Sequence, residues 1–448
     1  MLNQIKKMKM KKYAYLLLCV LIFGLTSCSD NEDKSYKTFT VNVQLVYPSS
    51  SGLTASEGVT VKLTSGNGGI YNATTDALGK ASFTVPAGIY EASASEQRSQ
   101  EGYIYLLNGI TSGISVTDTW ISEHTVQLSL TESKSSQIVI KEFYVGGCQN
   151  NNGSGTYLYD KYVILYNNSN TVASIDNLCI GLALPLNSNA TNNNYDSNGK
   201  LTYESEGFIP AGYGIWYFPQ TLTLQPAEEV VVSISGAINH TLTYSKSVNL
   251  ANASYYCMYD TEDWTNTNWY PAPYEGIPTS HYLLAEKYGP GSAWPISQHG
   301  PALFIFSTDG TTPSAFANDN SNNWYNGGNT TAPNLCKKVP TNWILDGIEI
   351  FSEPNQEKSK KRLTSTIDGG YTLLTPQLGH TSYRNVNKNA TEAIESNSGK
   401  LVYNYSYGND PSGIDAEASL KNGARIIYQD TNNSTNDFHQ RKQASLKD

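Results

Sequence analysis

The sequence predicts an all-β protein with two β-sandwich domains, and three observations support this. The chain has 448 residues, more than one domain of about 150 residues needs. Tyr is abundant at 32 residues, and Tyr, Val, Ile and Thr suit half-buried strands. Several short segments alternate apolar and polar residues with the period of two that a strand buried on one face requires.

Composition also excludes several classes of protein. Charged residues make up 15% of the chain, below the roughly 25% that is usual in soluble domains. The net charge of -9 disfavours non-specific nucleic-acid binding, so no nucleic-acid partner is expected. A coiled coil, a multi-span membrane protein and a basic DNA-binding protein are excluded.

The N-terminus predicts export and lipidation. Five lysines between Lys6 and Lys12 precede the apolar run Tyr13–Leu25, which is too short to span a bilayer comfortably. Leu25-Thr26-Ser27-Cys28 resembles a bacterial lipobox. The resemblance implies that residues 1–27 are a lipoprotein signal peptide and that Cys28 becomes the lipidated first residue. The alternative is an ordinary cleaved signal with a chance cysteine.

Residues 28–35 are expected to form a lipidated acidic tether. Ser29–Asp33 (SDNED) resembles the surface-export tag of Bacteroidetes lipoproteins, which implies an outer-membrane protein facing the cell exterior. A solvated acidic linker facing the periplasm is the alternative. Without residues 1–27, 25 basic residues remain against 39 acidic ones, a net charge of −14. Such a chain would not bind anionic headgroups electrostatically, so the lipid must hold it.

Residues 36–131 are predicted to form a small β-domain. Phe39–Leu45, Val59–Leu63 and Val126–Leu130 alternate apolar and polar residues. Asp76 and Gly79 have turn chemistry between strands, and Asp76 is interpreted as a turn residue rather than a catalytic acid. The pattern resembles a transthyretin-like, carboxypeptidase-regulatory β-sandwich, a module that usually serves as a spacer or stalk.

Thr131–Gln137 (TESKSSQ) is polar and aperiodic, which predicts a linker before a second domain at residues 138–448. Strands are expected at 138–144, 160–168 and 175–182. The segments IKEF (140–143), YVILYN (162–167) and LQPAEEVVV (224–232) together resemble a lamin-tail β-sandwich, here with long insertions.

Three further segments resemble a narrower family. AINHT (237–241), VPTNWILDG (339–347) and DTNNSTNDF (430–438) together resemble a Bacteroidetes family of outer-membrane lipoproteins of unknown function with a lamin-tail-like core. Members of that family look like companions of TonB-dependent transporters. The resemblance brings no catalytic residue with it.

Two of these motifs contain carboxylates that need explanation. Trp343–Phe351 is predicted to be a core strand, and Asp346 inside it needs partners because a buried carboxylate is costly. A structural aspartate bonded to backbone amides is one interpretation, and a metal ligand or site acid is the other. Arg425–Tyr428 is predicted to be the last strand. Asp430–Asp437 is interpreted as its turn-rich exit, with calcium or ligand binding as the alternative.

The aromatic segment at about 254–296 is the strongest candidate site. It lacks periodicity and is broken by prolines, which predicts a long loop or insertion of the kind that is often functional. A polar loop at 318–328 adds two aromatic residues and resembles a calcium loop only loosely. The rings either contact a ligand or partner or form a small core beneath the insertion. The candidate contact residues are Tyr259, Trp264, Trp269, Tyr270, Tyr274, His281, Tyr282, Trp294 and Trp324.

Four cysteines besides Cys28 remain in the mature chain. They are disulfide candidates whose pairing the sequence cannot assign, or they are free buried thiols. They are Cys148, Cys179, Cys257 and Cys336. No C-x-x-C or H-E-x-x-H pattern occurs, so neither a metal site nor a cofactor is expected.

We therefore expect a non-enzymatic, surface-exposed lipoprotein. We expect it to dock onto a TonB-dependent outer-membrane barrel, or to capture a small-molecule or glycan ligand for that barrel. A cell-surface adhesin or structural module that binds glycan or matrix protein is the alternative. A hydrolase that uses Asp260, Asp263 and His281 is a third and weaker hypothesis.

Overall fold

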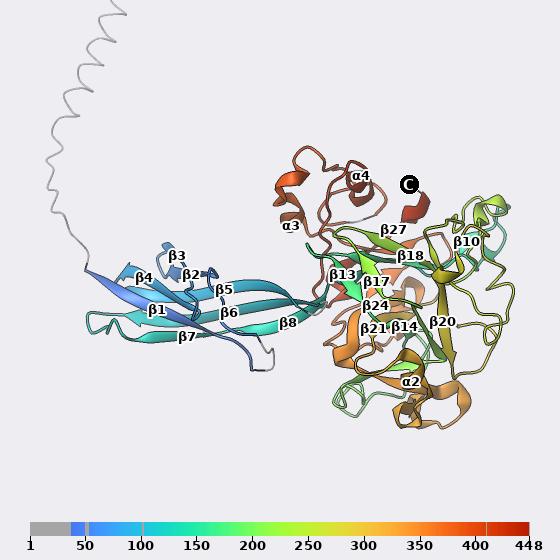
Figure 1. The fold of residues 1–448 in the computed structure, drawn as a ribbon, viewed down its shortest axis with the longest axis horizontal. Coiled ribbons are helices and arrows are strands. Elements are labelled where there is room, and N and C mark those ends of the chain that lie inside the picture. Colours follow the sequence, from blue (N-terminus) through green and yellow to red (C-terminus); the bar gives the residue numbers. More distant parts are fainter. Residues whose placement is uncertain (1–36, 50–52, 101–102, 409, 448) are drawn as a thin grey trace, which may run out of the picture. The chain divides into compact units, whose positions relative to one another are not determined.

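The structure is a computed structural model that describes residues 37–49, 53–100, 103–408 and 410–447. Strands dominate the fold and the few helices are short (Figure 1). The prediction of an all-β protein is confirmed. Cys28, with the leader and the tether, lies outside the described residues. Every helix in the described part is too short or too polar to cross a membrane.

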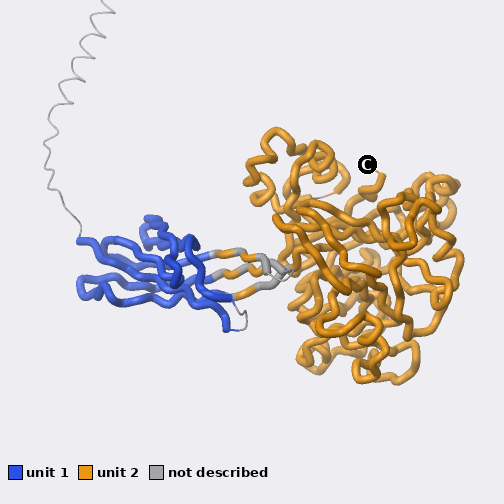
Figure 2. Tube along the Cα trace, viewed as in Figure 1, with its two compact units in different colours: residues 1–95, 108–131 blue, residues 96–107, 132–448 orange. Residues whose placement is uncertain are grey.

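The chain divides into two compact units, one of residues 1–95 and 108–131 and the other of residues 96–107 and 132–448 (Figure 2). A three-stranded sheet has the order β4-β1-β7. Its strands are Lys80–Pro86, Thr38–Val46 and Thr125–Ser129. A five-stranded sheet has the order β3-β2-β5-β6-β8. Its strands are Ile70–Thr74, Thr60–Ser65, Gly88–Gln100, Tyr103–Val116 and Thr131–Ser136.

The alternating segments of the first unit form strands as predicted. Phe39, Val41, Val43 and Leu45 of β1 are all buried. Asp76 is a turn residue, because its Oδ1 accepts the amides of Leu78 at 2.9 Å and Lys80 at 3.0 Å. The predicted linker is wrong, since residues 131–136 form β8. This strand ends the order of the five-stranded sheet, and edge strands are often polar.

A twelve-stranded sheet organises the second unit. Its order is β25-β24-β21-β14-β16-β20-β19-β18-β12-β9-β26-β27. The strands in that order are Thr372–Leu374, Ile344–Ser352, Ala302–Ser307, Leu178–Leu182, Gly214–Tyr217, Tyr282–Lys287, Tyr256–Met258, Glu229–Ser233, Tyr162–Asn167, Ile138–Tyr144, Thr381–Arg384 and Phe438–Arg441.

Smaller elements complete this unit. The remaining strands pair as β10-β11, β13-β17 and β15-β23-β22. They are Cys148–Gln149, Thr156–Tyr157, Ala173–Ile175, Leu222–Leu224, Phe208–Gly212, Leu335–Pro340 and Asn323–Tyr325. The α-helices α2 to α5 are Pro313–Asn318, Lys388–Glu392, Ala416–Lys421 and Ser434–Asp437. The 3-10 helices η1 to η9 are His240–Leu242, Thr279–His281, Asn320–Asn322, Asn326–Gly328, Ala332–Asn334, Thr341–Trp343, Glu353–Lys358, Glu395–Asn397 and Ser445–Lys447.

The long sheet folds back on itself around one large apolar core. Val163 of β12 and Ile305 of β21 belong to the same buried cluster although five strands lie between theirs in the sheet order. The Ile140 amide of β9 donates to Asp346 Oδ2 of β24 at 2.6 Å and ties the two halves together. All nine residues of β24 are buried, as expected of a strand covered on both faces.

The predicted last strand at 425–428 is wrong, and the last strand is β27. The apolar segment is largely buried, but its backbone forms only an isolated bridge, between Tyr428 and Val386, and side chains accept hydrogen bonds from the amides of Arg425, Ile427 and Tyr428. The amide of Arg425 donates to Asn397 Oδ1 at 2.8 Å and that of Tyr428 donates to Asn168 Oδ1 at 2.7 Å. The apolar character of this segment therefore correctly predicted burial. The segment is not a strand, because its amides bond side chains.

Candidate functional site

The aromatic segment at 254–296 contributes two strands, β19 and β20, to the long sheet. Tyr256–Met258 pairs in parallel with β18, and β20 pairs in parallel with Tyr256–Met258. The prediction of a segment without regular structure is therefore wrong for these two strands. Parallel pairs need long connections, and residues 259–281 supply the connection between β19 and β20.

Three of the predicted contact residues are core residues. Trp264, Tyr270 and Trp294 are 1%, 4% and 0% exposed and belong to the main apolar cluster. Trp294 Nε1 donates to the Gly214 carbonyl at 3.2 Å, and the Trp294 amide donates to Tyr270 Oη at 3.1 Å. The prediction that these three rings contact a ligand is wrong. They are buried in the core, where they anchor the connection between β19 and β20.

The other predicted aromatic residues differ in exposure. Tyr259 and Trp269 are partly buried against the same core, and Lys161 Nζ lies 5.2 Å from the Trp269 ring centroid. Trp324 packs edge-on against Tyr203 in a second core cluster. Tyr282 is half-buried and Tyr274 is 43% exposed.

His281 is the predicted residue that borders an open groove. The groove has a volume of about 330 Å³. We call it the His281 groove, and its lining is Leu222–Leu224, Glu228–Val231, Ser254–Tyr256 and His281. His281 stacks on Tyr256 with ring centroids 4.1 Å apart and planes 10° from parallel, and its Nδ1 lies 3.2 Å from the Tyr255 carbonyl oxygen. A groove of this size, with a flat aromatic rim and a few polar groups, suits a ligand or partner segment.

Carboxylates give the His281 groove its charge. Glu228 is exposed, and its Oε2 accepts the Gln225 amide at 2.7 Å. Glu229 Oε2 lies 2.5 Å from Nζ of Lys141, whose side chain is fully buried. Burial lowers the pKa of Lys141, but Glu229 and Glu417 together outweigh it and raise that pKa well above its usual value. The lysine thus stays charged and fixes Glu229 at the edge of the groove.

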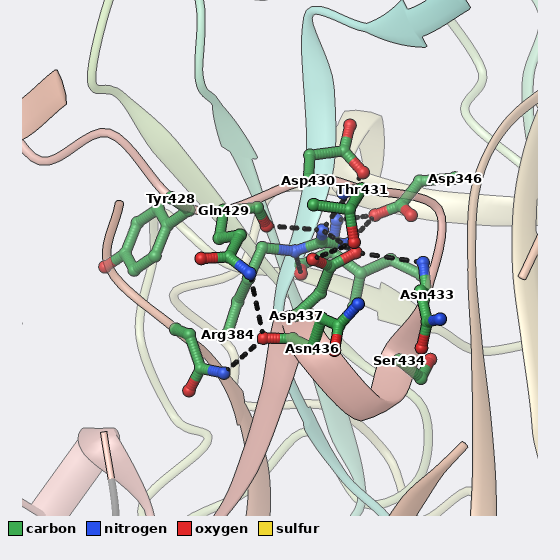
Figure 3. Close-up of polar contacts among 12 residues, drawn as sticks. Asp346, Arg384, Tyr428, Gln429, Asp430, Thr431, Asn433, Ser434, Asn436 and Asp437 are labelled. Carbon is green, nitrogen blue, oxygen red and sulfur yellow. Dashed lines mark hydrogen bonds and ion pairs between the residues drawn. The ribbon is translucent and has the colours of Figure 1, made fainter. Parts of the chain in front are cut away.

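A second polar cluster unites the two carboxylate motifs around Arg384 (Figure 3). Asp346 of β24 pairs with Arg384 Nη2, and Asp430 Oδ1 lies 3.3 Å from Arg384 Nη1. Asp437 accepts the amides of Thr431 at 2.8 Å and Asn433 at 3.1 Å through Oδ2. These bonds close the turn at 430–437, so its turn interpretation holds.

Asp346 has the partners that a buried carboxylate needs. Besides Arg384, it accepts the amides of Ile140 at 2.6 Å and Gly347 at 2.8 Å. Burial raises the pKa of Asp346 to about 7, against the lowering effect of Arg384. Asp346 also borders a cavity of about 440 Å³ together with Leu345 and Asn432. Its bonds join β9, β24 and β26, which makes it a structural aspartate.

The disulfide prediction is wrong, because all four cysteines are free and buried. Burial raises the pKa of the Cys148 thiol to about 11 and that of Cys257 to about 12. The cysteines lie on four different strands, β10, β14, β19 and β23, where they pack as small apolar side chains.

The calcium interpretation of the loop at 318–328 also meets a structural obstacle. Lys337 Nζ lies 2.6 Å from Asn323 Oδ1 and 3.1 Å from the Asp319 carbonyl oxygen. An ammonium group thus binds the oxygens that a calcium ion would need. Across the described residues, no group of three or more His, Cys, Asp or Glu side chains is placed to hold a metal ion.

Sequence reasoning missed two features of these sites. Arg384 lies in none of the sequence motifs. The signal that could have pointed to it is that two motifs with buried carboxylates need a cation as a partner. Glu228 and Glu229 appeared only as part of a strand pattern. Asp260, from the hydrolase hypothesis, accepts the amides of Glu262 and Asp263 at 2.6 and 2.9 Å and so forms a local turn.

Comparison with known proteins connects the second unit to a family of unknown function. Residues 225–445 match the family described as "Protein of unknown function (DUF4876)". The crystal structure of a DUF4876 family protein from Bacteroides thetaiotaomicron VPI-5482 is similar to this chain with a TM-score of 0.51. The two chains are 20% identical over 91% of this chain and 96% of that one, a likeness of fold. Neither match indicates a catalytic family.

Other comparisons add little. BcpA, the major pilin subunit of Bacillus cereus, matches with a TM-score of 0.16 and 12% identity over 44% of this chain and 52% of that one. A TM-score this low does not indicate a shared fold. No curated protein matches the chain.

Proposed function

We propose that this protein is a lipid-anchored, non-enzymatic outer-membrane surface protein that docks a partner at the His281 groove. The partner we propose is a TonB-dependent barrel, for which the protein acts as an accessory in ligand capture. The lipobox-like Leu25–Cys28 and the acidic tether support the location. They would hold the protein at the membrane by its lipid, whereas a free exported protein would diffuse away.

The observation that supports the docking role is that some rings of the aromatic segment are buried whereas others border a groove. Trp264, Tyr270 and Trp294 are buried and immobilise the connection between β19 and β20. Tyr256 and His281 stay half-buried at the rim of an open groove. Rigid aromatic groups on a fixed scaffold contribute contact area at a low entropic cost, which is typical of protein interfaces.

The test is cross-linking in native outer membranes. The intact lipidated protein would carry a photo-cross-linking amino acid at Thr223, an exposed residue of the His281 groove, and in a matched sample at exposed Leu242. We expect a barrel cross-linked in stoichiometric amount from position 223 and not from position 242. Recovery of the lipoprotein alone from both samples would overturn the proposal. Binding to glycan or matrix protein without a barrel would instead support an adhesin.

A further inference from the structure

The edge of β18 at the His281 groove lacks a strand neighbour. On one side, all five residues of Glu229–Ser233 pair with β12. On the other side, β19 pairs only with Val232 and Ser233. The chain before β19 turns away at this point, because the Tyr255 amide donates to the Asn252 carbonyl at 3.0 Å. The sheet therefore has a gap beside Glu229–Val231.

Two hydrogen bonds show which backbone groups face this gap. The Ile234 amide donates to the Lys161 carbonyl at 2.8 Å, and the Glu228 carbonyl accepts the Asn167 amide at 2.9 Å. Both bonds lie on the β12 side of the strand. Because successive residues of an antiparallel strand direct their N–H and C=O groups to alternate sides, Glu229 and Val231 direct theirs away from β12. The parallel pairing of Val232 with Tyr256 uses the Val231 carbonyl, which leaves the Val231 amide and both backbone groups of Glu229 facing the groove.

The gap has the dimensions of a short strand. Three residues of a strand span about 10 Å, at 3.3–3.4 Å per residue. The groove of about 330 Å³ is lined by these residues together with Leu222–Leu224, Tyr256 and His281. An unpaired strand edge in such a groove is a template for pairing with an extended segment.

The charge of the groove indicates which kind of peptide segment it would bind. The groove contains two carboxylates, of which Glu229 pairs with Lys141 and Glu228 is exposed. Among the described residues, no lysine or arginine forms an ion pair with Glu228, an exposed residue that lines the groove. The chain as a whole is also acidic, with a net charge of -9. A cationic side chain on the incoming segment would be complementary to this rim.

We propose that the His281 groove binds an extended, basic peptide segment of a partner protein by adding it as a strand to the open edge of β18. Hydrogen bonds to both backbone groups of Glu229 and to the Val231 amide would hold the segment, and a lysine or arginine on it would pair with Glu228. This inference rests on the proposed docking function and names the form of its partner.

The experiment uses the full chain and labelled heptapeptide probes in fluorescence polarisation. The basic probe is Thr-Lys-Val-Thr-Val-Lys-Thr, and a matched acidic probe replaces both lysines with glutamates. We expect the basic probe to bind at least about fivefold more tightly than the acidic one. N-methylation of the basic probe at alternate residues should weaken binding at one set of positions and leave the other set unchanged, since only one edge of the added strand faces β18.

Two protein-side measurements complete the test. Glu228→Lys should weaken binding of the basic probe at least about fivefold, whereas Glu357→Lys, the same charge change at an exposed residue outside the groove, should leave it unchanged. Hydrogen exchange at single-residue resolution should show the Glu229 and Val231 amides becoming protected on binding. The Val230 amide, which faces β12, should be protected with and without probe.

Equal binding of both probes, N-methylation effects without alternation, or unchanged exchange at Glu229 and Val231 would overturn strand addition. These results are independent of the membrane cross-linking experiment. A barrel recovered from position 223 together with any of them would retain the docking function and reject the strand-addition mode. Strand addition by the probe with no barrel recovered would retain the site and reject the transporter partner.

Discussion

Tyr256 and His281 stack with ring centroids 4.1 Å apart although 24 residues separate them in the chain. The register of two parallel strands explains this. Cys257 pairs with Tyr282, and Tyr256 and His281 are the residues immediately before them. The pairing of β19 with β20 therefore assembles the aromatic rim of the His281 groove.

The first prediction concerns this rim. His281→Ala should weaken partner binding at least about fivefold, roughly 1 kcal/mol, because it removes one ring of the stack. The unfolding midpoint should change little, since His281 is half-buried. Cross-linking yield in membranes and thermal unfolding measure the two effects. Tyr274→Ala, which removes an exposed ring outside the groove, is the control. Equal losses in both variants would contradict a specific role for the rim.

The second prediction separates the core rings from the surface rings. Trp264→Ala should lower the free energy of unfolding by about 3–5 kcal/mol, because Trp264 is 1% exposed in the main core. Tyr274→Ala should change it by no more than about 0.5 kcal/mol. Urea unfolding of both variants is the measurement. A small effect of Trp264→Ala would mean that this ring is not in the core.

The third prediction is a pH dependence due to Asp346. Its folded-state pKa is raised to about 7, mainly by burial. A carboxyl group with a raised pKa stabilises the fold fully below its unfolded pKa near 4 and loses that contribution as the pH rises through about 7. Asp346→Asn should therefore flatten the decline in unfolding free energy between pH 4 and 7. Asp309→Asn, at an exposed carboxylate, should leave the profile unchanged, and identical profiles for both variants would refute the assignment.

The fourth prediction has the opposite sign and concerns His439. Burial, with a smaller contribution from Arg441, lowers the pKa of His439 to about 3. The neutral ring bonds Asn385 Oδ1 at 2.7 Å and Tyr405 Oη at 3.1 Å. Its contribution is present above pH 6.5 and is lost as the pH falls toward 3. His439→Gln should make the acid-side loss of stability less steep, while His124→Gln, at an exposed histidine, should not. Unfolding measured by pH titration distinguishes the two.

The fifth prediction follows from the four free thiols. Cys148, Cys179, Cys257 and Cys336 are buried, and burial raises the pKa of each thiol. Iodoacetamide should leave them unmodified in the native protein and modify all four in guanidinium chloride, as counted by mass spectrometry. Reductant should not shift the unfolding midpoint. A thiol that stays unmodified after denaturation, and reacts only once reductant is added, would reveal a disulfide.

Predictions from sequence succeeded where the determinant was local. The alternation in β1 and the apolar run of β24 predicted strands, because side-chain periodicity reflects which faces are covered. They failed where a distant group decided the outcome. Arg425–Tyr428 is apolar like a strand, yet Asn168, 260 residues from Tyr428, provides the acceptor for the Tyr428 amide. Residues 131–136 are polar like a linker, yet they form the edge of a sheet.

The sequence by itself determined the all-β class, the positions of several core strands, the Asp76 turn and the need of Asp346 for partners. These depend on neighbouring residues and on the cost of burial. Only the tertiary structure decided that Arg384 meets Asp346, that Trp264 is buried while His281 borders a groove, and that β18 keeps an open edge. Each of these depends on strand pairing between segments that are far apart in the chain, and a local pattern of residues carries no information about that pairing.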